Sequence, residues 1–493
     1  MILVLLLATP LLATAVCWLV RRPKVPQTVT VVSSFLSLVW AVVATMQLLK
    51  QGNLRALHDW LYADALSMVT LIIIAFVGFT AAIYSIGYIH LDLSSEDVSP
   101  SEAARRRQLF YTLMNLFLFT MLVVPITNSL GVLWITIEGT TLASLFLVSF
   151  YRTREALEAA WKYIIIGSVG IALGLFGTIL TYYSAVRVLG TSYDLNWSVL
   201  QPVAHELNPD VMRLALLFII VGYGTKAGLA PMHTWLPDAH SEAPSPISAL
   251  LSGVLLNCAL YAVLRFYVLA TPSVGHAYPD ALLLGFGLLS ILIAAVFILR
   301  QRDYKRMLAY SSVEHIGIAS LGIAFGGALG FSGALLQLIN HAVTKSLMFF
   351  ASGHVLLRYR TKQIDQVSGI VRVLPVTGSM LLLGGLALAG APPFGIFGSE
   401  LTVLAAGFRH GHGLAAVIAV SLMAVVFIGL LGSLNRMSFG APPAKVPRGE
   451  ASLSGIVALG FSMALVLGLG LFVPSPLAKL LQQAAQVLAG GNP

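Results

Sequence analysis

DVMRLALLFIIVGYGTKAGLAPMHTWLPDAH, residues 210–240, decides the fold class. The segment is long and apolar enough to cross a membrane, since a helix needs about 20 mostly apolar residues for about 30 Å of hydrocarbon. It nevertheless contains Lys226, followed by Pro231 and Pro237, which remove backbone donors and interrupt a helix. A charge at membrane depth is costly and marks a functional site by default. The segment therefore predicts a membrane protein with a discontinuous spanning helix.

The composition of the whole chain agrees with a membrane protein. Its 493 residues are 58% hydrophobic and 10% charged, against roughly 45–50% and 25% in a soluble domain. The two cysteines, Cys17 and Cys258, are too few for a disulfide framework, a zinc site or an iron–sulfur cluster. We therefore expect no metal, no cofactor and no redox centre in this chain, so that any oxidoreductase activity belongs to partner subunits.

Fourteen runs of the sequence meet the length requirement for a spanning helix. They lie at about 1–20, 27–49, 62–90, 109–126, 129–150, 162–187, 210–240, 245–270, 279–300, 306–325, 328–358, 374–408, 413–435 and 452–473. No run shows the alternating segments of about ten residues that a β-barrel needs. The sequence therefore predicts an all-α polytopic membrane protein with about 14 transmembrane helices.

Lysine and arginine are distributed unevenly between the two sides of these spans. One side holds 20 of them, beginning with Arg21, Arg22 and Lys24, and the other side holds 7. Because positive residues accumulate on the cytoplasmic side, we expect both termini on the outer, periplasmic side of a bacterial or archaeal plasma (inner) membrane. The net charge of +9 is then a topology signal and requires no nucleic-acid partner.

No soluble domain can be separated from the spans, so we divide the chain by helices. The expected parts are 1–108, with helices 1 to 3; 109–270, a first repeat of helices 4 to 8; 279–435, a second repeat of helices 9 to 13; and 436–493, with helix 14. The tail from Pro474 has the pattern of a short amphipathic surface helix.

Few ionisable residues fall inside the predicted spans, where each costs at least about 2.5–3.5 kcal/mol. They are Glu138 in span 5, Lys226 in span 7, Glu314 and His315 in span 10, His341 and Lys345 in span 11, and Glu400 in span 12. Asp64 and His354 lie nearer to span ends and are weaker candidates. We expect the first set to form a proton pathway.

The spacing of these residues indicates an internal repeat. Glu138 precedes Lys226 by 88 residues, and Glu314 precedes Glu400 by 86. The two pairs are five spans apart, an odd number, so the halves would cross the membrane in opposite directions. Glu400 also follows a Gly/Pro-rich break, LAGAPPFGIFGSE. Interrupted helices at matching positions of two inverted repeats are typical of a transport site, so helices 7 and 12 are expected to be broken there.

Paired carboxylate and amine groups favour proton transfer over transport of an organic solute. Burial disfavours the charged form of each group, whereas an opposite charge favours it. A Glu/Lys pair whose separation changes can therefore take up or release a proton. His341 and Lys345 are four residues apart, on one helix face, and could relay protons between the halves.

Several of these residues also have structural interpretations. Glu138 could be a structural carboxylate bonded to Thr140 or Thr141, and Glu314 and His315 could pair with each other or with a loop.

Two histidines near the cytoplasmic end of span 7 have two interpretations. His233 and His240 could belong to a proton entry or could be satisfied polar histidines. Asp238 and Glu242, in the same segment, are expected to cap and solvate the following loop.

Four segments of the sequence resemble one family. They are YADALSMVTLIIIAFVG (62–78), GYGTKAGLAPMHTWLPDAHSEAPSPISALL (222–251), RDYKRMLAYSSVEHIGI (302–318) and HAVTKSLMFFASG (341–353). They are similar to the antiporter-like membrane subunits of respiratory complex I, Mrp-type sodium/proton antiporters and group-4 membrane-bound [NiFe] hydrogenases. The resemblance implies that Glu138 and Lys226 form a proton-pumping pair, that His341 and Lys345 belong to a central axis, and that Glu400 faces an outer exit.

Within that family, the segments EHIGI (314–318) and SGVLLNCALYAVLRF (252–266) look most like component F of hydrogenase-4-type complexes. One position departs from the pattern: complex I homologues commonly have Lys or His in the middle of span 8, where this chain has Asn257. Because Asn cannot titrate, either water with His341 and Lys345 completes the link, or the half-channels are joined differently, or conduction is lost.

The resemblance implies a proton-translocating subunit of a membrane-bound oxidoreductase complex, similar to hydrogenase-4. The alternatives are a subunit of an Mrp-type cation/proton antiporter or of complex I, and a non-conducting structural subunit. The expected partners are lipid, protons or sodium ions, and other membrane subunits, including homologous antiporter-like ones. Peripheral redox subunits would be coupled indirectly.

Overall fold

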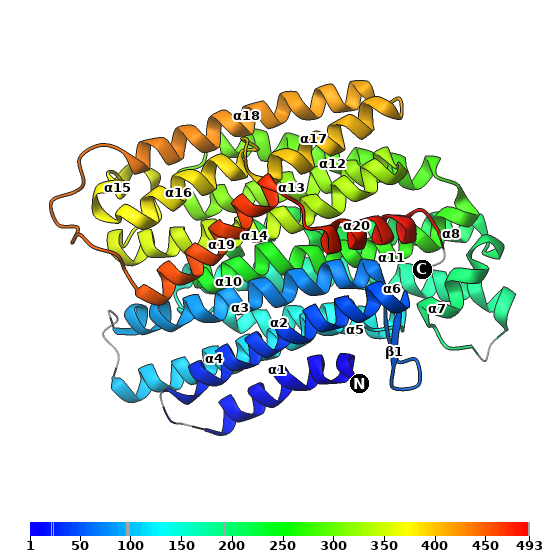
Figure 1. Ribbon diagram of the computed structural model, residues 1–493, viewed down its shortest axis with the longest axis horizontal. Coiled ribbons are helices and arrows are strands. Elements are labelled where there is room, and N and C mark those ends of the chain that lie inside the picture. The colour runs from blue at the N-terminus through cyan, green and yellow to red at the C-terminus, as the bar shows by residue number, and fades with distance from the viewer. Residues whose placement is uncertain (21, 23, 95–98, 191–192, 492–493) are drawn as a thin grey trace.

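Long, nearly parallel helices form an elongated bundle in the computed structural model, which describes residues 1–20, 22, 24–94, 99–190 and 193–491 (Figure 1). Arg21, the first of the arginines assigned to the cytoplasmic side, lies outside the described residues.

Within the described part of the chain, eleven helical segments are long and apolar enough to cross a membrane. They are α1 (Ile2–Leu19), α2 (Val25–Gln51), α3 (Ala65–Ser94), α5 (Leu130–Val148), α6 (Arg154–Leu189), α8 to α9 (Pro209–Glu242), α10 to α11 (Ser245–Val274), α12 (Ala277–Ile298), α13 (Tyr304–Phe325), α18 (Gly413–Ser438) and α19 (Leu453–Leu471). The protein is thus a helical, polytopic membrane protein.

Further helices occupy the other expected spans and the connections. They are α4 (Pro100–Val123), α14 (Gly327–Tyr359), the pair α16 (Pro375–Leu388) and α17 (Gly395–Arg409), the short elements α7 (Trp197–Leu200), η1 (Gln201–Glu206), η4 (Ile364–Gln366) and α15 (Ile370–Val373), and the C-terminal α20 (Ser475–Leu488).

Burial separates a central layer of helices from a peripheral one. The most apolar windows of α10 to α11 and of α13 are 100% buried, whereas that of α18 is 22% buried and that of α1 is 28% buried. The central helices therefore carry the groups that are shielded from lipid.

Side-chain caps begin several helices. Ser129, Thr153, Asn208 and Asp303 accept backbone N–H groups at the starts of α5, α6, α8 and α13.

A short two-stranded antiparallel hairpin precedes α3 in this otherwise helical protein. β1 (Leu54–Ala56) pairs with β2 (Leu61–Ala63). The sequence predicted a span from residue 62, because the apolar run continues through β2. Instead α3 begins at Ala65, where Asp64 accepts a hydrogen bond from the backbone N–H of Ser67 at 3.0 Å.

In the part of the chain that the structure describes, the helical conformation is interrupted at two places within the bundle. α8 ends at Ala227, and Gly228 adopts a left-handed conformation (φ 83°) before η2 (Met232–Thr234) and α9 (Trp235–Glu242). Trp235 Nε1 donates to the carbonyl of Thr225 at 2.8 Å and so satisfies one carbonyl at the end of α8. The second interruption, residues 389–394, separates α16 from α17.

The tail forms an amphipathic helix, α20, whose apolar face packs on the bundle. Its apolar side chains are buried, among them Leu480, Leu481 and Leu488, and α20 contacts α3 and α14. Figure 1 shows it aligned with the bundle. An amphipathic pattern specifies an apolar face but not whether lipid or protein covers it.

Candidate functional site

Lys226 and Glu138 are joined through one side-chain hydroxyl. Lys226 Nζ donates to Thr141 Oγ1 at 2.5 Å and to the Tyr163 hydroxyl at 2.9 Å. Thr141 Oγ1 in turn donates to Glu138 Oε2 at 3.2 Å. Among the described residues no direct ion pair links Lys226 to Glu138, so Thr141 is the connection between them.

Three helices position this first cluster. Glu138 and Thr141 are three residues apart and share one face of α5, and Tyr163 projects from α6. Lys226 is the penultimate residue of α8, and its side chain is completely buried. The C-terminal end of a helix carries a partial negative charge, which favours a cation at this position.

Glu138 is only half-buried and accepts a second hydrogen bond, from Ser168 Oγ at 3.2 Å. The structural interpretation of this carboxylate required a bond to Thr140 or Thr141, and Thr141 provides one. Thr140 instead donates to the carbonyl of Ile137 at 2.6 Å. Thr141 therefore contacts both Glu138 and Lys226.

The second cluster is built around Lys345, between α13 and α14. Lys345 Nζ donates to the carbonyl of Leu308 at 2.5 Å and to the Ser311 hydroxyl. Glu314 lies one turn beyond Ser311 on α13 and is 3% exposed. Glu314 Oε2 has no hydrogen-bond partner within the described part of the chain.

His315 faces Glu400 rather than Glu314. Its Nδ1 lies 3.8 Å from Glu400 Oε1 and 2.9 Å from Gln337 Nε2. Gln337 Oε1 accepts a hydrogen bond from Ser399 Oγ at 2.5 Å. The pairing of Glu314 with His315 that we considered is therefore not formed, and the polar contacts instead connect α13, α14 and α17 next to the α16–α17 interruption.

Gln337 and Ser399 are residues that the sequence analysis missed. Gln337 lies four residues before His341, which lies four before Lys345, so the three share one face of α14. That spacing was the available signal for Gln337. Ser399 directly precedes Glu400, but nothing in its residue type marks it as more than one of many hydroxyls in the spans.

His341 and Asn257 contribute further buried polar atoms beside the second cluster. The His341 ring centroid lies 5.4 Å from that of His315, and neither of its ring nitrogens has a hydrogen-bond partner among the described residues. Asn257 Nδ2 donates to Gly253 at 2.7 Å and to the carbonyl of Leu338 at 3.4 Å, while its Oδ1 is unpartnered within the same set. Asn257 thus packs against the part of α14 that carries His341.

No hydrogen bond among the described residues joins His233 or His240 to either cluster. His240 Nδ1 lies 2.7 Å from the carbonyl of Leu236 in its own helix, and the His233 ring packs 6.0 Å from the ring of Tyr310. Both side chains are buried, and each has one ring nitrogen without a described partner.

Asp238 and Glu242 form ion pairs rather than simply capping and solvating a loop. Asp238 contacts Lys162 at 3.0 Å and Arg306 at 2.9 Å. Glu242 contacts Lys362 at 2.5 Å. These pairs tie α9 to α6, to α13 and to the segment after α14.

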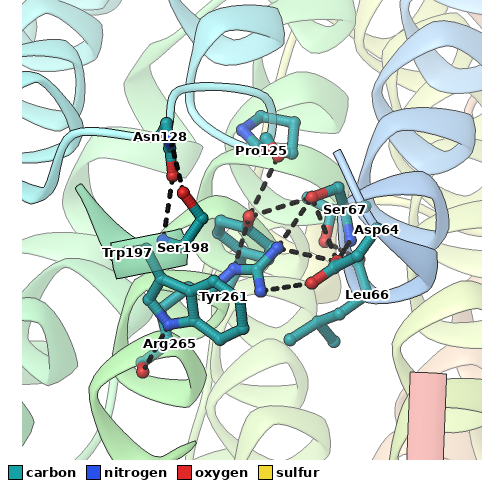
Figure 2. Close-up of polar contacts among 10 residues, drawn as sticks. Asp64, Leu66, Ser67, Pro125, Asn128, Trp197, Ser198, Tyr261 and Arg265 are labelled. Atoms are coloured by element: carbon teal, nitrogen blue, oxygen red, sulfur yellow. Dashed lines mark hydrogen bonds and ion pairs between the residues drawn. The ribbon is translucent and has the colours of Figure 1, made fainter. Parts of the chain in front are cut away.

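Asp64 and Arg265 form a buried ion pair that the sequence analysis also missed (Figure 2). Arg265, one of the seven basic residues that the charge distribution assigns to the outer side of the membrane, is only 3% exposed. Within the described residues no group of three or more His, Cys, Asp or Glu side chains is arranged to hold a metal ion, and Cys17 and Cys258 are free.

Comparison with known proteins assigns the family. The family described as "NADH:quinone oxidoreductase/Mrp antiporter, TM" matches residues 127–427, and "NADH-Ubiquinone oxidoreductase (complex I), chain 5 N-terminus" matches residues 58–95. The chain belongs to the complex I/Mrp antiporter-like family of membrane subunits. This antiporter-like subunit is 40% identical over 428 residues to the hydrogenase-4 component F homolog of Methylacidiphilum infernorum (isolate V4), covering 86% of this chain and 88% of that protein.

Other relatives of this antiporter-like subunit come from several kinds of complex. NADH-quinone oxidoreductase subunit N of Desulforudis audaxviator (strain MP104C) is 31% identical over 392 residues, covering 79% of this chain and 75% of that protein. A chain of the archaeal membrane-bound sulfane sulfur reductase has the same fold, with a TM-score of 0.86, 26% identity and coverage of 99% and 97%. A chain of the Mrp complex from Dietzia sp. DQ12-45-1b shares the fold, with a TM-score of 0.85, 20% identity and coverage of 99% and 97%. These structural matches are parts of multi-subunit membrane complexes.

Proposed function

We propose that this antiporter-like subunit moves protons across a bacterial or archaeal plasma membrane, as part of a membrane-bound oxidoreductase complex similar to hydrogenase-4. The observation that carries the proposal is the Lys226–Thr141–Glu138 connection at the end of an interrupted helix. The 40% identity to a hydrogenase-4 component F homolog supports the type of complex. Electron transfer would take place in other subunits. It would act on this chain by changing the positions of its charged side chains.

The proposed topology has fourteen spans, with both termini outside and two inverted repeats of five helices at 109–270 and 279–435. The eleven segments selected by length and composition are supplemented by α4, α14 and the α16–α17 pair. The interruptions after α8 and after α16 occupy matching places in the two repeats. This arrangement supports a transport site at the level of the interruptions.

Within the first repeat, proton transfer would pass through the Thr141 hydroxyl. Lys226 in its ammonium form gives a proton to Thr141 Oγ1, and the proton that Thr141 already holds moves to the Glu138 carboxylate. Both end groups become neutral, and no other atom changes its bonds. Movement of Lys226 toward or away from Thr141 would open or close this step, which is how an external conformational change could drive it.

The link to the second repeat would use internal water. Asn257 Oδ1 and both ring nitrogens of His341 are buried polar atoms without described partners. Buried polar groups are normally satisfied by protein or by ordered water. Water at these atoms would let protons reach Lys345 and Glu314 even though Asn257 cannot titrate.

Protons would enter and leave at opposite ends of this pathway. His233 and His240 follow the first interruption and would serve as the cytoplasmic entry. Glu400 lines a hollow of about 490 Å³ between α17 and α18, together with Phe397 and Leu401, and would serve as the outer exit. His315, 3.8 Å from Glu400, would deliver the proton.

Partner subunits are expected on the face of α5. Glu138 is half-buried there, and its neighbours Ile135 and Leu142 are 58% and 54% exposed. A carboxylate at membrane depth needs cover from a protein surface or from water. A homologous antiporter-like subunit docked on this face would complete its burial.

The experiment that tests the proposal uses the complex purified with this chain and reconstituted into sealed vesicles. Glu138→Gln removes the proton acceptor with little change in shape, so protons pumped per electron should fall sharply. Glu158→Gln, on the exposed surface of α6, is the matched control and should pump normally. Unchanged pumping by the Glu138→Gln complex would reject the assignment.

The same vesicles separate this proposal from its alternatives. Sodium-dependent proton flux without any electron donor would favour an Mrp-type antiporter. Normal coupling after joint neutralisation of Glu138, Lys226 and Glu400 would favour a structural subunit.

A further inference from the structure

Asp64 and Arg265 form a cluster whose hydrogen-bonding groups are almost fully occupied (Figure 2). Arg265 Nη1 donates to Asp64 Oδ2 at 2.6 Å, and Nη2 donates to Asp64 Oδ1 at 2.7 Å. The two side chains are 4% and 0% exposed. The pair joins the start of α3 to α11 at the end of the bundle that carries the β1–β2 hairpin.

The surrounding hydroxyls complete this cluster. Arg265 Nε donates to the Tyr261 hydroxyl at 2.7 Å, and Nη2 also donates to Ser67 Oγ at 2.8 Å. The Tyr261 hydroxyl lies 2.9 Å from the carbonyl of Pro125, to which it donates. The guanidinium carbon lies 4.4 Å above the Trp197 ring. Four segments, α3, the loop before α5, α7 and α11, therefore converge on one guanidinium.

Part of the cluster lies on the same face of α11 as Asn257, at the centre of the proposed proton pathway. Asn257, Tyr261 and Arg265 follow one another at intervals of four residues on α11, so they share one face. Asn257 contacts the part of α14 that carries His341. This face therefore runs from the middle of the pathway toward the hairpin end of the bundle, which the proposed topology places outside.

A proton moving along a chain of hydrogen bonds needs an oxygen that is free to accept it. Here the Tyr261, Ser67 and Asp64 oxygens already accept hydrogen bonds from Arg265, which does not release a proton in proteins. The Tyr261 proton is directed to a carbonyl, which cannot pass it on. Each of these side-chain oxygens thus already accepts a hydrogen bond from a cation that keeps its protons, at the point where the α11 face reaches the outside.

We propose that the cluster of Asp64, Ser67, Tyr261 and Arg265 is a proton seal, which closes the hairpin end of the α11 face so that protons reaching Asn257 and His341 leave only through Glu400. The proposal rests on the proposed function, because it assumes protons at the centre of the chain. Arg265 acts in this account as a positioning residue: it occupies the acceptors and takes no part in the transfer.

The test measures passive proton leak through the reconstituted complex, with a potassium diffusion potential as driving force and no electron donor. Arg265→Gln leaves Asp64 without its partner and should raise the leak several-fold. The double variant Asp64→Asn with Arg265→Gln removes the freed carboxylate and should bring the leak back toward the wild-type rate. Arg213→Gln breaks an exposed ion pair with Asp210 at the same end of the bundle and should leave the leak unchanged.

Two milder variants keep the test decisive if Arg265→Gln fails to assemble. Tyr261→Phe and Ser67→Ala retain the ion pair but free a hydrogen-bonding position beside it, and each should raise the leak less than Arg265→Gln does. Wild-type leak in assembled Arg265→Gln, or in both milder variants, would overturn the proposal and leave the cluster a structural contact. Since this assay involves no turnover, its result is independent of whether Glu138→Gln stops pumping.

Discussion

Lys226 and Glu138 lie on two different helices and are linked by hydrogen bonds through the Thr141 hydroxyl. This hydroxyl accepts from Lys226 Nζ at 2.5 Å and donates to Glu138 Oε2 at 3.2 Å. An ion pair in direct contact would hold both charges in place. A hydroxyl between them allows the charges to be neutralised by transfer of a proton.

Thr141→Val should uncouple these two groups, because it removes the hydroxyl and keeps the side-chain shape. A hydrogen bond to a charged group contributes about 1.5–3 kcal/mol, so transfer should slow by about one to two orders of magnitude. Proton pumping in sealed vesicles measures the effect, and Thr141→Ser should restore most of it. Thr140→Val is the control, since the Thr140 hydroxyl bonds only within its own helix; equal loss in both variants would argue against a relay.

Asn257→Leu should interrupt the link between the two repeats, because it removes the polar atom that we expect to hold water. The leucine is similar in size, so the complex should assemble normally while pumping falls. Asn257→His should retain pumping, since histidine can both hold water and titrate. Cys258→Ala changes the adjacent buried residue as a control, and wild-type pumping by Asn257→Leu would mean that the half-channels are joined elsewhere.

Gln337→Leu should weaken proton exit. The change removes the amide that contacts His315 Nδ1 and Ser399 Oγ beside Glu400, so His315 loses the partner that orients it. We expect slower pumping with an intact complex, measured as protons per electron. Ser320→Ala, which deletes a hydroxyl bonded only to its own helix, should have no comparable effect, and a normal rate for Gln337→Leu would remove His315 from the exit.

Arg265→Gln should also lower the stability of the purified complex. Breaking a buried ion pair by removing one partner costs about 3–5 kcal/mol, whereas an exposed pair such as Arg213 with Asp210 contributes about 0–1 kcal/mol. Thermal unfolding in detergent should therefore show a clear decrease in Tm for Arg265→Gln and little change for Arg213→Gln. Equal decreases in Tm would show that burial of the Asp64–Arg265 pair does not affect its contribution to stability.

The sequence allowed prediction of the features that have a large effect on the free energy of the chain in a membrane. Apolar runs located the helices, and Pro231, Pro392 and Pro393 located the interruptions, because proline cannot donate a backbone hydrogen bond. Lys226 and Glu138 were recognised because a charge inside a span is costly.

Contacts between side chains of different helices could not be predicted. Thr141 and Ser399 are two of many hydroxyls in the spans, and most such hydroxyls bond only to their own helix. Arg265 lies near the end of a span, and its ion pair joins it to Asp64, 201 residues away in the sequence. The hairpin and the packing of α20 depend on contacts between distant segments, which a local pattern does not specify.

The most direct test of the central claim is the number of protons pumped per electron by the reconstituted complex carrying Lys226→Ala, measured against Lys50→Ala, an exposed lysine at the end of α2. We predict that Lys226→Ala abolishes pumping through this subunit while Lys50→Ala pumps like the wild type. A Lys226→Ala complex that assembles fully and pumps the wild-type number of protons per electron would contradict the account.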